Sequence, residues 1–288
     1  FGAELCFIEM INCRSISHKS SRTKAMLSSN AQDRPLGIQI LGCEDNYILK
    51  ALDVLKGYKF DLLDFNAACP AKKVVRRGEG ASLMKEPRLL YKLLKLVVRN
   101  SLWPVTLKIR SGWDKRSINA KDVAICAQDA GVKAVFVHGR SREQAYGGSV
   151  DYRVIKEVKD ALDIPVIASG DILSAKLAKR MLDETGCEGL AIARGSLGNP
   201  WIFREIKEFL NKGEVLSNPS IDDITGVMLR HLDSSIDFYG ERNGVVLFRK
   251  FFSWYTKGLR KVRLLRERSS RAKTRLDMLE ICKSVKRR

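Results

Sequence analysis

Short apolar runs that alternate with longer helix-like segments restrict most strongly how this chain can fold. Seven such runs occur, at residues 5–10, 37–41, 62–66, 105–110, 134–138, 165–169 and 189–193. Each is about five residues long and bounded by turn residues, as buried strands are. Helices are predicted between them at 45–57, 86–100, 119–131, 151–162 and 174–185, with Asn119 and Ser174 as N-caps and Gly131 and Gly186 as stops. Strands that alternate with helices form right-handed βαβ units, so we expect a parallel sheet.

Polar and reactive side chains gather at the C-terminal ends of these runs. A (β/α)8 barrel builds its active site at this end of its strands. Open doubly wound sheets also bind ligands there, so the pattern predicts a site without choosing between the two folds. The residues concerned are Gln39, Asn66 to Cys69, Lys108, Arg110, His138 to Arg140, Ser169 to Asp171, and Arg194.

The number of runs favours an incomplete barrel. A (β/α)8 barrel has eight strands, whereas seven runs are present and the sequence after Ala193 turns helical and basic. We therefore expect an α/β fold, a TIM-type barrel over residues 1–210 that holds strands 2–8 and lacks its first β/α unit. The chain opens at Phe1 directly before an apolar run, which favours a fragment of a longer protein over true degeneration.

A second domain is expected after this barrel. Residues 211–220 contain Gly213, Pro219 and small polar residues and are predicted to be a linker. Residues 221–288 are predicted to form a small all-α domain. If one helix continues past Gly258, an apolar face falls opposite a basic face. The apolar face holds Phe248, Phe251, Phe252, Tyr255, Leu259 and Val262, and the basic face holds Arg249, Lys250, Lys257, Arg260, Lys261, Arg268, Arg271 and Arg275.

The charge of the chain indicates a polyanionic partner. The sequence holds 52 Lys and Arg against 33 Asp and Glu, a net charge of +19. Residues 241–288 contribute 16 basic and 4 acidic side chains, a net of +12. Such a one-sided excess favours nucleic acid first and an anionic membrane surface second. No apolar run approaches the roughly 18–20 residues that span a bilayer, and no signal peptide is visible, so we expect a cytoplasmic protein without a membrane segment.

The cysteines favour a reducing compartment. There are seven, widely spaced and without a CxxC pair, which argues against a disulfide framework or a zinc site. Cys69 stands apart, because it follows a strand and precedes a loop that contains Lys72, Lys73, Arg76 and Arg77. Most free cysteines are small buried hydrophobes, but cations around an exposed strand-end thiol favour reactivity. We therefore predict a functional role for Cys69 and no bound metal.

The segment around Cys69 resembles a known family. Asn66-Ala67-Ala68-Cys69-Pro70, followed by a basic loop with glycines, resembles the signature of the tRNA-dihydrouridine synthases. The resemblance extends through nearly the whole chain and is closest to the bacterial B-type branch. It is carried further by Lys108-Ile109-Arg110, Val137-His138-Gly139-Arg140, Ser169-Gly170-Asp171, Ala193-Arg194-Gly195 and Asn199-Pro200-Trp201.

This resemblance implies FMN-dependent reduction of uridine to 5,6-dihydrouridine in tRNA, with NADPH as reductant. Cys69 would protonate C5 of the uracil ring, and Asn66 would help to hold that ring. Gln39, Lys108 and His138 would contact the flavin ring and ribityl chain. The FMN phosphate would be held by Ser169, Gly170, Asp171, Ala193 and Arg194. Contacts to tRNA are expected from Arg76, Arg77, Arg140, Arg249 and Lys250, in a protein that we expect to be a monomer.

Several departures from the family pattern keep two alternatives open. The family usually has Gly where Ala68 and Ala193 stand and Asn where Ser169 stands, and a Pro-Met segment of its first strand is absent. A methyl group at Ala193 lies where backbone is expected to approach phosphate closely. One alternative is a catalytically impaired RNA-binding descendant. The other is an FMN barrel oxidoreductase acting on a small molecule, which the basic domain and the Cys69 loop disfavour. Trp201 and His231 are expected to pack rather than to act on substrate.

Overall fold

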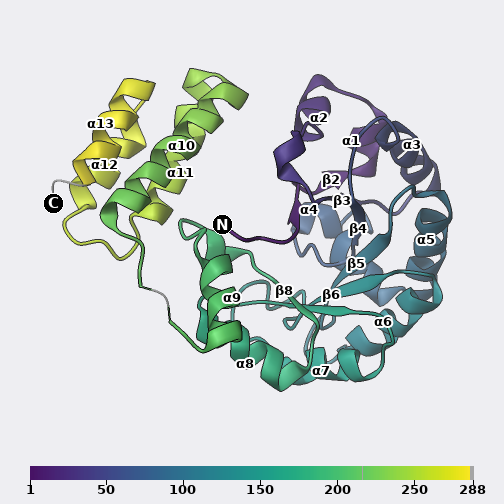
Figure 1. Ribbon diagram of the computed structural model, residues 1–288. Coiled ribbons are helices and arrows are strands. Elements are labelled where there is room, and N and C mark those ends of the chain that lie inside the picture. Colours follow the sequence, from purple (N-terminus) through teal and green to yellow (C-terminus); the bar gives the residue numbers. More distant parts are fainter. Residues whose placement is uncertain (216, 286–288) are drawn as a thin grey trace. The chain divides into compact units, whose positions relative to one another are not determined.

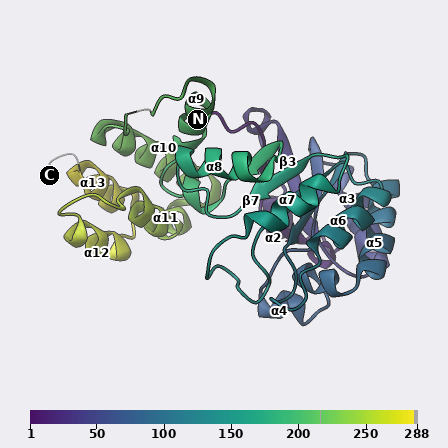
Figure 2. The same ribbon diagram turned by 90° about the horizontal axis from the view of Figure 1, so that it is seen from below.

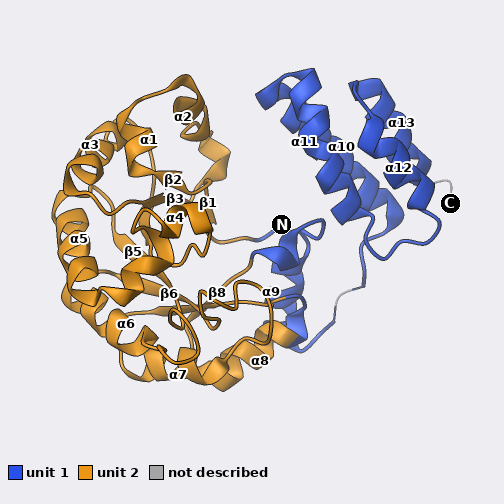
Figure 3. Ribbon diagram, turned by 180° about the vertical axis from the view of Figure 1, so that it is seen from behind, with its two compact units in different colours: residues 1–2, 173–176, 193–288 blue, residues 3–172, 177–192 orange. Residues whose placement is uncertain are grey.

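The computed structural model describes residues 1–215 and 217–285 and divides into two compact units (Figure 3). The larger unit consists of Ala3–Ile172 and Leu177–Ile192. The smaller unit consists of Phe1–Gly2, Leu173–Lys176 and the described part of Ala193–Arg288. Residue 216 of the predicted linker and residues 286–288 of the predicted basic domain lie outside the described residues.

The larger unit is built on a parallel sheet whose strands follow one another in chain order (Figure 1). Alternate positions of these strands are fully buried, as at Ile38, Phe65 and Leu107. A parallel sheet of successive βα units confirms the predicted TIM-type class of fold. The order runs through β1 (Cys6–Phe7), β3 (Leu36–Leu41), β4 (Leu62–Asn66), β5 (Val105–Arg110), β6 (Ala134–His138), β7 (Val166–Ser169) and β8 (Gly189–Ala191), and β2 (Ile11–Asn12) also pairs with β3.

Helices cover the outer side of this sheet. In the views of Figures 1 and 2, α3, α5, α6 and α7 lie in sequence around it, and each packs on the next. The longer helices are α3 (Asp45–Leu55), α5 (Pro87–Asn100), α6 (Ala120–Asp129), α7 (Tyr152–Asp160) and α8 (Ala175–Thr185). The short helical segments are α1 (Cys13–Ser17), α2 (Ser21–Met26), η1 (Ala31–Asp33), α4 (Lys72–Val75) and η2 (Gly80–Lys85).

Two predicted helix ends are found where glycine was expected to stop the helix. Gly131 follows α6 with φ 97° and Gly186 follows α8 with φ 69°. Asn119 occupies the N-cap position of α6 but makes no capping hydrogen bond. Its Nδ2 donates instead to the carbonyl oxygen of Met84 at 2.7 Å. Asn119 therefore occupies the predicted N-cap position, but its side chain does not cap the helix. It connects the helix to the segment that follows β4.

The first predicted strand, residues 5–10, differs from the prediction. Only Cys6–Phe7 and Ile11–Asn12 pair with β3, and the side chains of Cys6 and Phe7 are exposed rather than buried. The ring of Phe7 fills the space above Gly37, where an added Cβ would lie 2.4 Å from Cε1 of Phe7. These residues lie at the end of the strand order, where a segment pairs on one side only.

Helices make up most of the smaller unit. Its core contains Met228, Leu232, Phe248, Phe252 and Met278, each at most 1% exposed. α9 extends to Lys212, two residues into the predicted linker 211–220, and ends at the left-handed Gly213, whereas the Ser220–Asp223 capping box begins α10. The elements are η3 (Arg194–Ser196), α9 (Ile202–Lys212), α10 (Ile221–Tyr239), α11 (Glu241–Tyr255), α12 (Arg263–Arg271) and α13 (Arg275–Val285).

Trp201 and His231 pack in this unit, as the sequence predicted. Trp201 is 7% exposed and meets the ring of Phe1 edge-on, with centroids 5.6 Å apart. The His231 ring lies 4.3 Å from that of Phe251, and its Nδ1 is 3.2 Å from the hydroxyl of Tyr255. Compact grouping places α9 with the helical segments, and the domain limits 1–210 and 221–288 stay predictions.

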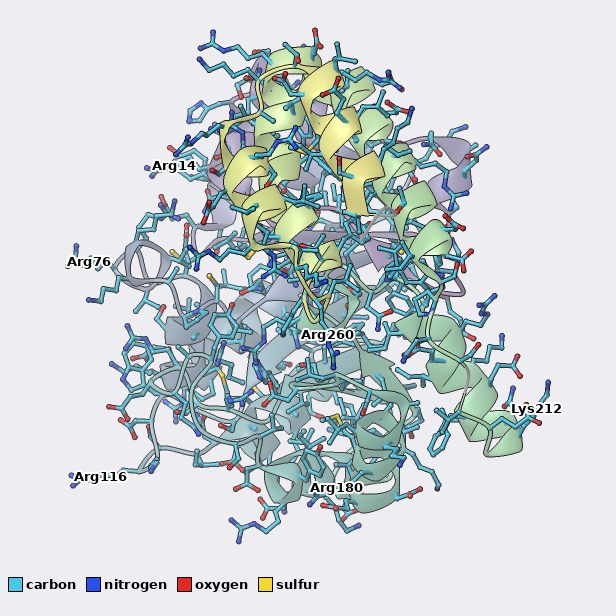
Figure 4. The ribbon with its side chains drawn as sticks, turned by 90° about the vertical axis from the view of Figure 1, so that its left-hand side faces the viewer. Arg14, Arg76, Arg116, Arg180, Lys212 and Arg260 are labelled. Carbon is cyan, nitrogen blue, oxygen red and sulfur yellow. The ribbon has the colours of Figure 1, made fainter. Side chains whose placement is uncertain are left out.

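The single helix past Gly258 that the basic face required is not formed, so this prediction is wrong. α11 ends at Tyr255, Gly258 has φ 84°, and a new helix starts only at Arg263. The guanidinium of Arg266 turns back to the backbone carbonyl of Thr256 at 2.5 Å, which stabilises the break. The predicted basic residues are consequently spread over α11, α12, α13 and the loops between them, where all except Arg249 are exposed; Arg260 in the loop is marked in Figure 4.

Candidate active site

Cys69 lies in a tight turn directly after β4. The side-chain Oδ1 of Asn66 accepts hydrogen bonds from the backbone N–H groups of Ala68 at 3.0 Å and Cys69 at 2.8 Å. An Asn side chain that mimics a backbone turn in this way fixes the local conformation. The carbonyl oxygen of Cys69 accepts from the backbone N–H of Ala81 at 3.1 Å. The backbone N–H and the carbonyl oxygen of Cys69 are therefore both hydrogen-bonded. The half-buried thiol lies at the C-terminal edge of the sheet.

Gly80 allows the following loop to close over Cys69. It has φ 60°, a left-handed conformation that favours glycine. A Cβ added to Gly80 would lie 2.8 Å from the carbonyl oxygen of Cys69 and 3.0 Å from its Cβ. The neighbouring Glu79 is 6% exposed and accepts hydrogen bonds from Asn12 Nδ2 at 2.8 Å and Arg77 Nη2 at 2.8 Å. Arg77 is thus paired within the loop, whereas Arg76 is exposed and extends away from the ribbon (Figure 4).

A chain of side-chain hydrogen bonds leads from Asp64 to this turn. Gln39 Nε2 donates to Asp64 Oδ2 at 2.6 Å, and Asn66 Nδ2 donates to Gln39 Oε1 at 2.9 Å. Thr106 Oγ1 donates to the other carboxylate oxygen at 2.7 Å. Burial raises the pKa of Asp64 to about 6, against the opposing effects of the two hydrogen bonds and of Lys108. The chain orients both amides that the sequence assigned to the site.

Lys108 of β5 contributes a cation to the interior of the site. The sheet register places Lys108 beside Asn66 on one side and Phe136 on the other. Its Nζ donates to Ser169 Oγ at 2.5 Å, and Ser169 Oγ in turn donates to the carbonyl oxygen of Val137 at 3.2 Å. Burial lowers the pKa of Lys108 to about 8, although Asp64 opposes the shift. Near neutral pH the ammonium group is therefore charged.

His138 at the end of β6 presents a buried nitrogen with no partner. Among the described residues, nothing hydrogen-bonds its Nε2. Burial, followed by the nearby Lys108, Arg110 and Arg140, lowers the pKa of the imidazole to about 3. Gly170 has φ 118°, and a Cβ added there would lie 2.9 Å from His138 Nε2. The Gly170 backbone therefore packs directly against the imidazole, and a residue with a side chain would not fit at this position.

Two buried arginines hold the loops around these strand ends. Arg110 Nε donates to the carbonyl oxygen of Ala68 at 2.8 Å. Arg140 is 2% exposed, donates from Nη2 to the carbonyl oxygen of Gly148 at 2.6 Å, and forms an ion pair with Asp171. Asp171 itself has φ 49°, which is uncommon for a residue other than glycine. Among the described residues, Nη1 of Arg140 is buried without a hydrogen-bond partner.

Comparison with known proteins identifies the family of this chain. The dihydrouridine synthase family matches residues 1–288, the full length of the sequence. The chain belongs to the dihydrouridine synthase family. It is 38% identical over 259 residues to the tRNA-dihydrouridine synthase B of Pasteurella multocida, covering 90% of this chain and 78% of that one. This bears out the resemblance seen in the sequence.

Two further relatives carry the same name. The chain is 43% identical over 223 residues to the tRNA-dihydrouridine synthase B of Xanthomonas axonopodis pv. citri, covering 77% of this chain and 67% of that one. It is 36% identical over 270 residues to the Pseudomonas aeruginosa protein of that name, covering 94% and 81%. Relatives named as B-type synthases agree with the branch that the sequence motifs indicated.

In this member of the dihydrouridine synthase family, most predicted site residues come together on consecutive strands of the larger unit. These are Gln39, Asn66, Cys69, Lys108, His138, Ser169, Gly170 and Asp171. Ala193 and Arg194 follow β8 in the smaller unit, and both are exposed. Arg249 and Lys250 also belong to the smaller unit. Arg249 donates to the carbonyl oxygen of Ala272 at 2.5 Å, while Lys250 is exposed beside the ring of Phe251.

Four residues of this synthase site were not assigned from the sequence: Asp64, Glu79, Gly80 and Arg110. Asp64 carried a usable signal, because a carboxylate inside the apolar run of residues 62–66 needs a buried partner. Gly80 and Glu79 act through contacts with Cys69 and Asn12 that no local pattern reveals. Arg110 was noted at a strand end, but its hydrogen bond to Ala68 depends on the pairing of β4 with β5.

The residues present fit a flavin mononucleotide. Among the described residues, the buried His138 Nε2 has no hydrogen-bond partner, and the Lys108 ammonium lies buried on the neighbouring strand; a polar cofactor would supply partners for both. No described group of three or more His, Cys, Asp or Glu is placed to hold a metal. Among the described helices, none has the length and apolar character that crossing a bilayer requires.

Proposed function

We propose that this chain reduces uridine in tRNA to 5,6-dihydrouridine, with FMN as cofactor, NADPH as reductant and Cys69 as proton donor. The observation that carries the proposal is the turn that fixes Cys69 at the end of β4, on the same sheet edge as Lys108 and His138. Membership of the dihydrouridine synthase family and the names of the relatives support the substrate class. We further expect a cytoplasmic monomer.

The cofactor contacts are assigned residue by residue from the family resemblance. Gln39, Lys108 and His138 are assigned to the ring and ribityl chain, and Ser169, Gly170, Asp171, Ala193 and Arg194 to the phosphate. When bound, FMN supplies the hydride that reaches C6 of the uracil ring. The charged Lys108 favours negative charge on the reduced ring, and the pKa of His138 near 3 keeps its imidazole neutral at physiological pH.

The side chains near β4 would act on the uracil. Cys69 holds the proton that C5 receives, which leaves a saturated ring and a thiolate that must be reprotonated. Asn66 gives one N–H to Gln39, and the second hydrogen of its amide is free to donate to a uracil carbonyl. Because Asn66 Oδ1 also accepts from the backbone of the Cys69 turn, one side chain would position both the proton donor Cys69 and the uracil ring.

The predicted tRNA contacts divide into two groups. Arg76 and Lys250 are exposed, so their charges are available to phosphates. Arg77, Arg140 and Arg249 are engaged with Glu79, Asp171 and the carbonyl of Ala272. We assign the second group to positioning of loops and helices, with the exposed cations of the C-terminal helices providing most of the attraction for RNA.

The test compares Cys69→Ala with Cys6→Ala, a change at an exposed cysteine outside the site. Loss of a general acid lowers product formation by about a hundredfold or more, so Cys69→Ala should lose dihydrouridine in tRNA while keeping flavin absorbance and tRNA affinity. Cys6→Ala should stay within about twofold of the wild type, as surface changes do. Dihydrouridine formed by Cys69→Ala at the wild-type rate would overturn the role of this residue.

The colour and the tRNA affinity of the purified wild-type protein distinguish the proposed function from its two alternatives. Ser169 and Ala193 replace the expected Asn and Gly, which is the observation that favours an RNA-binding descendant. Ser169 nevertheless holds Lys108 Nζ at 2.5 Å. A colourless protein that binds tRNA with salt-sensitive affinity would support the descendant. A yellow protein without tRNA affinity would support an oxidoreductase for a small molecule.

A further inference from the structure

Asp64 stands at the beginning of a continuous hydrogen-bonded chain that ends at the backbone of Cys69. Its Oδ2 accepts from Gln39 Nε2 at 2.6 Å, and Gln39 Oε1 accepts from Asn66 Nδ2 at 2.9 Å. Asn66 Oδ1 then accepts from the N–H of Cys69 at 2.8 Å. Three side chains on neighbouring strands β3 and β4 thus connect a carboxylate to the turn that carries the thiol.

The carboxylate determines the direction of every bond in this chain. A carboxylate only accepts hydrogen bonds, whereas a primary amide has one accepting and one donating end. Gln39 must therefore turn its nitrogen to Asp64 and its oxygen to Asn66. Asn66 must in turn direct its nitrogen to Gln39 and its oxygen to the Cys69 turn. Reversal of either amide would bring two donors or two acceptors face to face.

The surroundings keep Asp64 in this accepting role. It is 1% exposed, and its second oxygen accepts from Thr106 at 2.7 Å. Lys108 is the nearby cation that favours its charged form, and burial opposes it, giving a pKa of about 6. Above that pH the group is mostly a carboxylate. A buried charge is retained only where hydrogen bonds compensate for lost water, and here those bonds are the ones that orient Gln39.

We infer that Asp64 is a positioning residue that holds the Cys69 turn through Gln39 and Asn66. The role of Cys69 rests on the proposed function, but the chain of contacts does not. Asp64 would act as a hydrogen-bond acceptor for Gln39, and its negative charge would not be required. Asp64→Leu removes both. Asp64→Asn removes the charge but keeps an oxygen toward Gln39, because its new N–H₂ group can donate to Thr106 Oγ1.

The test measures alkylation of Cys69 by iodoacetamide in the full chain, followed at that residue by mass spectrometry over a range of pH. The pH midpoint reports the charge around the thiol, and the plateau rate at high pH reports its accessibility. We expect Asp64→Leu to raise the plateau by about threefold or more, since a half-buried thiol becomes accessible when its turn loosens. Asp64→Asn should keep the plateau within about twofold of the wild type.

Two further variants complete the test. Gln39→Met keeps the Asp64 side chain but removes the donor to its Oδ2 and breaks the link to Asn66, so it should raise the plateau as Asp64→Leu does. This variant decides the matter if Asp64→Leu fails to fold. Thr106→Val removes the other hydrogen bond of Asp64 and is the matched control, with a plateau within about twofold of the wild type. Circular dichroism melting identifies the folded variants.

Two results would overturn the inference. One is a wild-type plateau in folded Asp64→Leu and Gln39→Met. The other is an Asp64→Asn plateau raised as far as that of Asp64→Leu, which would assign the effect to charge. Alkylation requires no turnover, so absence of dihydrouridine formation by the wild type would remove the proposed function and leave this result standing.

Discussion

The Nε of Arg110 donates a hydrogen bond to the carbonyl oxygen of Ala68 at 2.8 Å, one residue before Cys69. Its Nη1 donates to the carbonyl oxygens of Ser141 at 3.0 Å and Ala145 at 2.8 Å. One guanidinium, 2% exposed, therefore joins the loop after β4 to the loop after β6. These loops flank the site, so the arginine acts as an internal brace between them.

We expect Arg110→Met to destabilise the larger unit by about 2–4 kcal/mol, because the carbonyl oxygens of Ala68 and Ser141, which are buried, and that of Ala145, which is partly buried, lose a charged donor. The denaturant midpoint measured by circular dichroism gives the size of the change. Arg116→Met is the control, since Arg116 is exposed at the tip of its loop (Figure 4) and should change the midpoint little. Equal midpoints for the two variants would contradict the role of Arg110.

Gly80→Ala should abolish proton donation without unfolding the chain. The new Cβ would lie 2.8 Å from the backbone oxygen of Cys69, so the turn must move. Dihydrouridine formation is expected to fall by about a hundredfold, the contribution of a well-placed acid. Gly186→Ala is the matched control, because it is also left-handed, with φ 69°, but has nothing within 4 Å of its Cβ position. It should cost only about 1–2 kcal/mol of stability and leave the rate unchanged.

His138 should make the flavin-free protein sensitive to acid. Burial lowers its folded pKa from 6.5 to about 3, so the unfolded chain binds a proton that the folded chain does not. The neutral His138 therefore contributes its full share of the free energy of unfolding only above the unfolded-state pKa of 6.5, and this contribution is lost as the pH falls toward 3. The free energy of unfolding should drop by about 1–2 kcal/mol more in the wild type than in His138→Gln between about pH 7 and pH 5. Denaturant titrations at the two pH values measure it, and equal drops would refute the prediction.

Arg249 and Lys250 are adjacent but should behave differently. Lys250→Gln removes an exposed charge. We expect about threefold weaker tRNA binding, and the slope of the logarithm of the binding constant against the logarithm of the salt concentration should fall in magnitude by about one. Arg249→Gln removes the donor of the Ala272 carbonyl and should instead destabilise the helices by about 1–2 kcal/mol. Filter binding over a salt series and thermal melting separate the two effects. A larger loss of tRNA affinity in Arg249→Gln than in Lys250→Gln, with unchanged melting, would reverse the assignment.

The strands and most helices could be predicted because burial leaves a strong local signal. Runs such as residues 134–138 are mainly apolar where the strand is covered on both faces. The break after Tyr255 could not be predicted, because glycine costs a helix only about 1 kcal/mol and tertiary contacts decide the outcome. Here the bond from Arg266 to Thr256 stabilises the break. The interruption of residues 5–10, at the end of the sheet, was likewise not predicted.

The sequence predicted which side chains lie at the strand ends. It did not predict the hydrogen bonds that hold these strand ends in place. Cys69, Lys108 and His138 follow from residue type and position. The bonds from Thr106 to Asp64 and from Arg110 to Ala68 join residues 42 apart in sequence, and they depend on the register of β4 against β5. Periodicity does not encode register in a strand buried on both faces, since no exposed face marks a slip.

The order of the strands also orders events during synthesis. Every side chain of the site in the larger unit comes from residues 39–171, on neighbouring strands laid down in sequence. A chain that leaves the ribosome from its N-terminus exposes all of them before α10 to α13 have been made. In the function proposed here, these side chains are therefore made before the helices that would attract RNA.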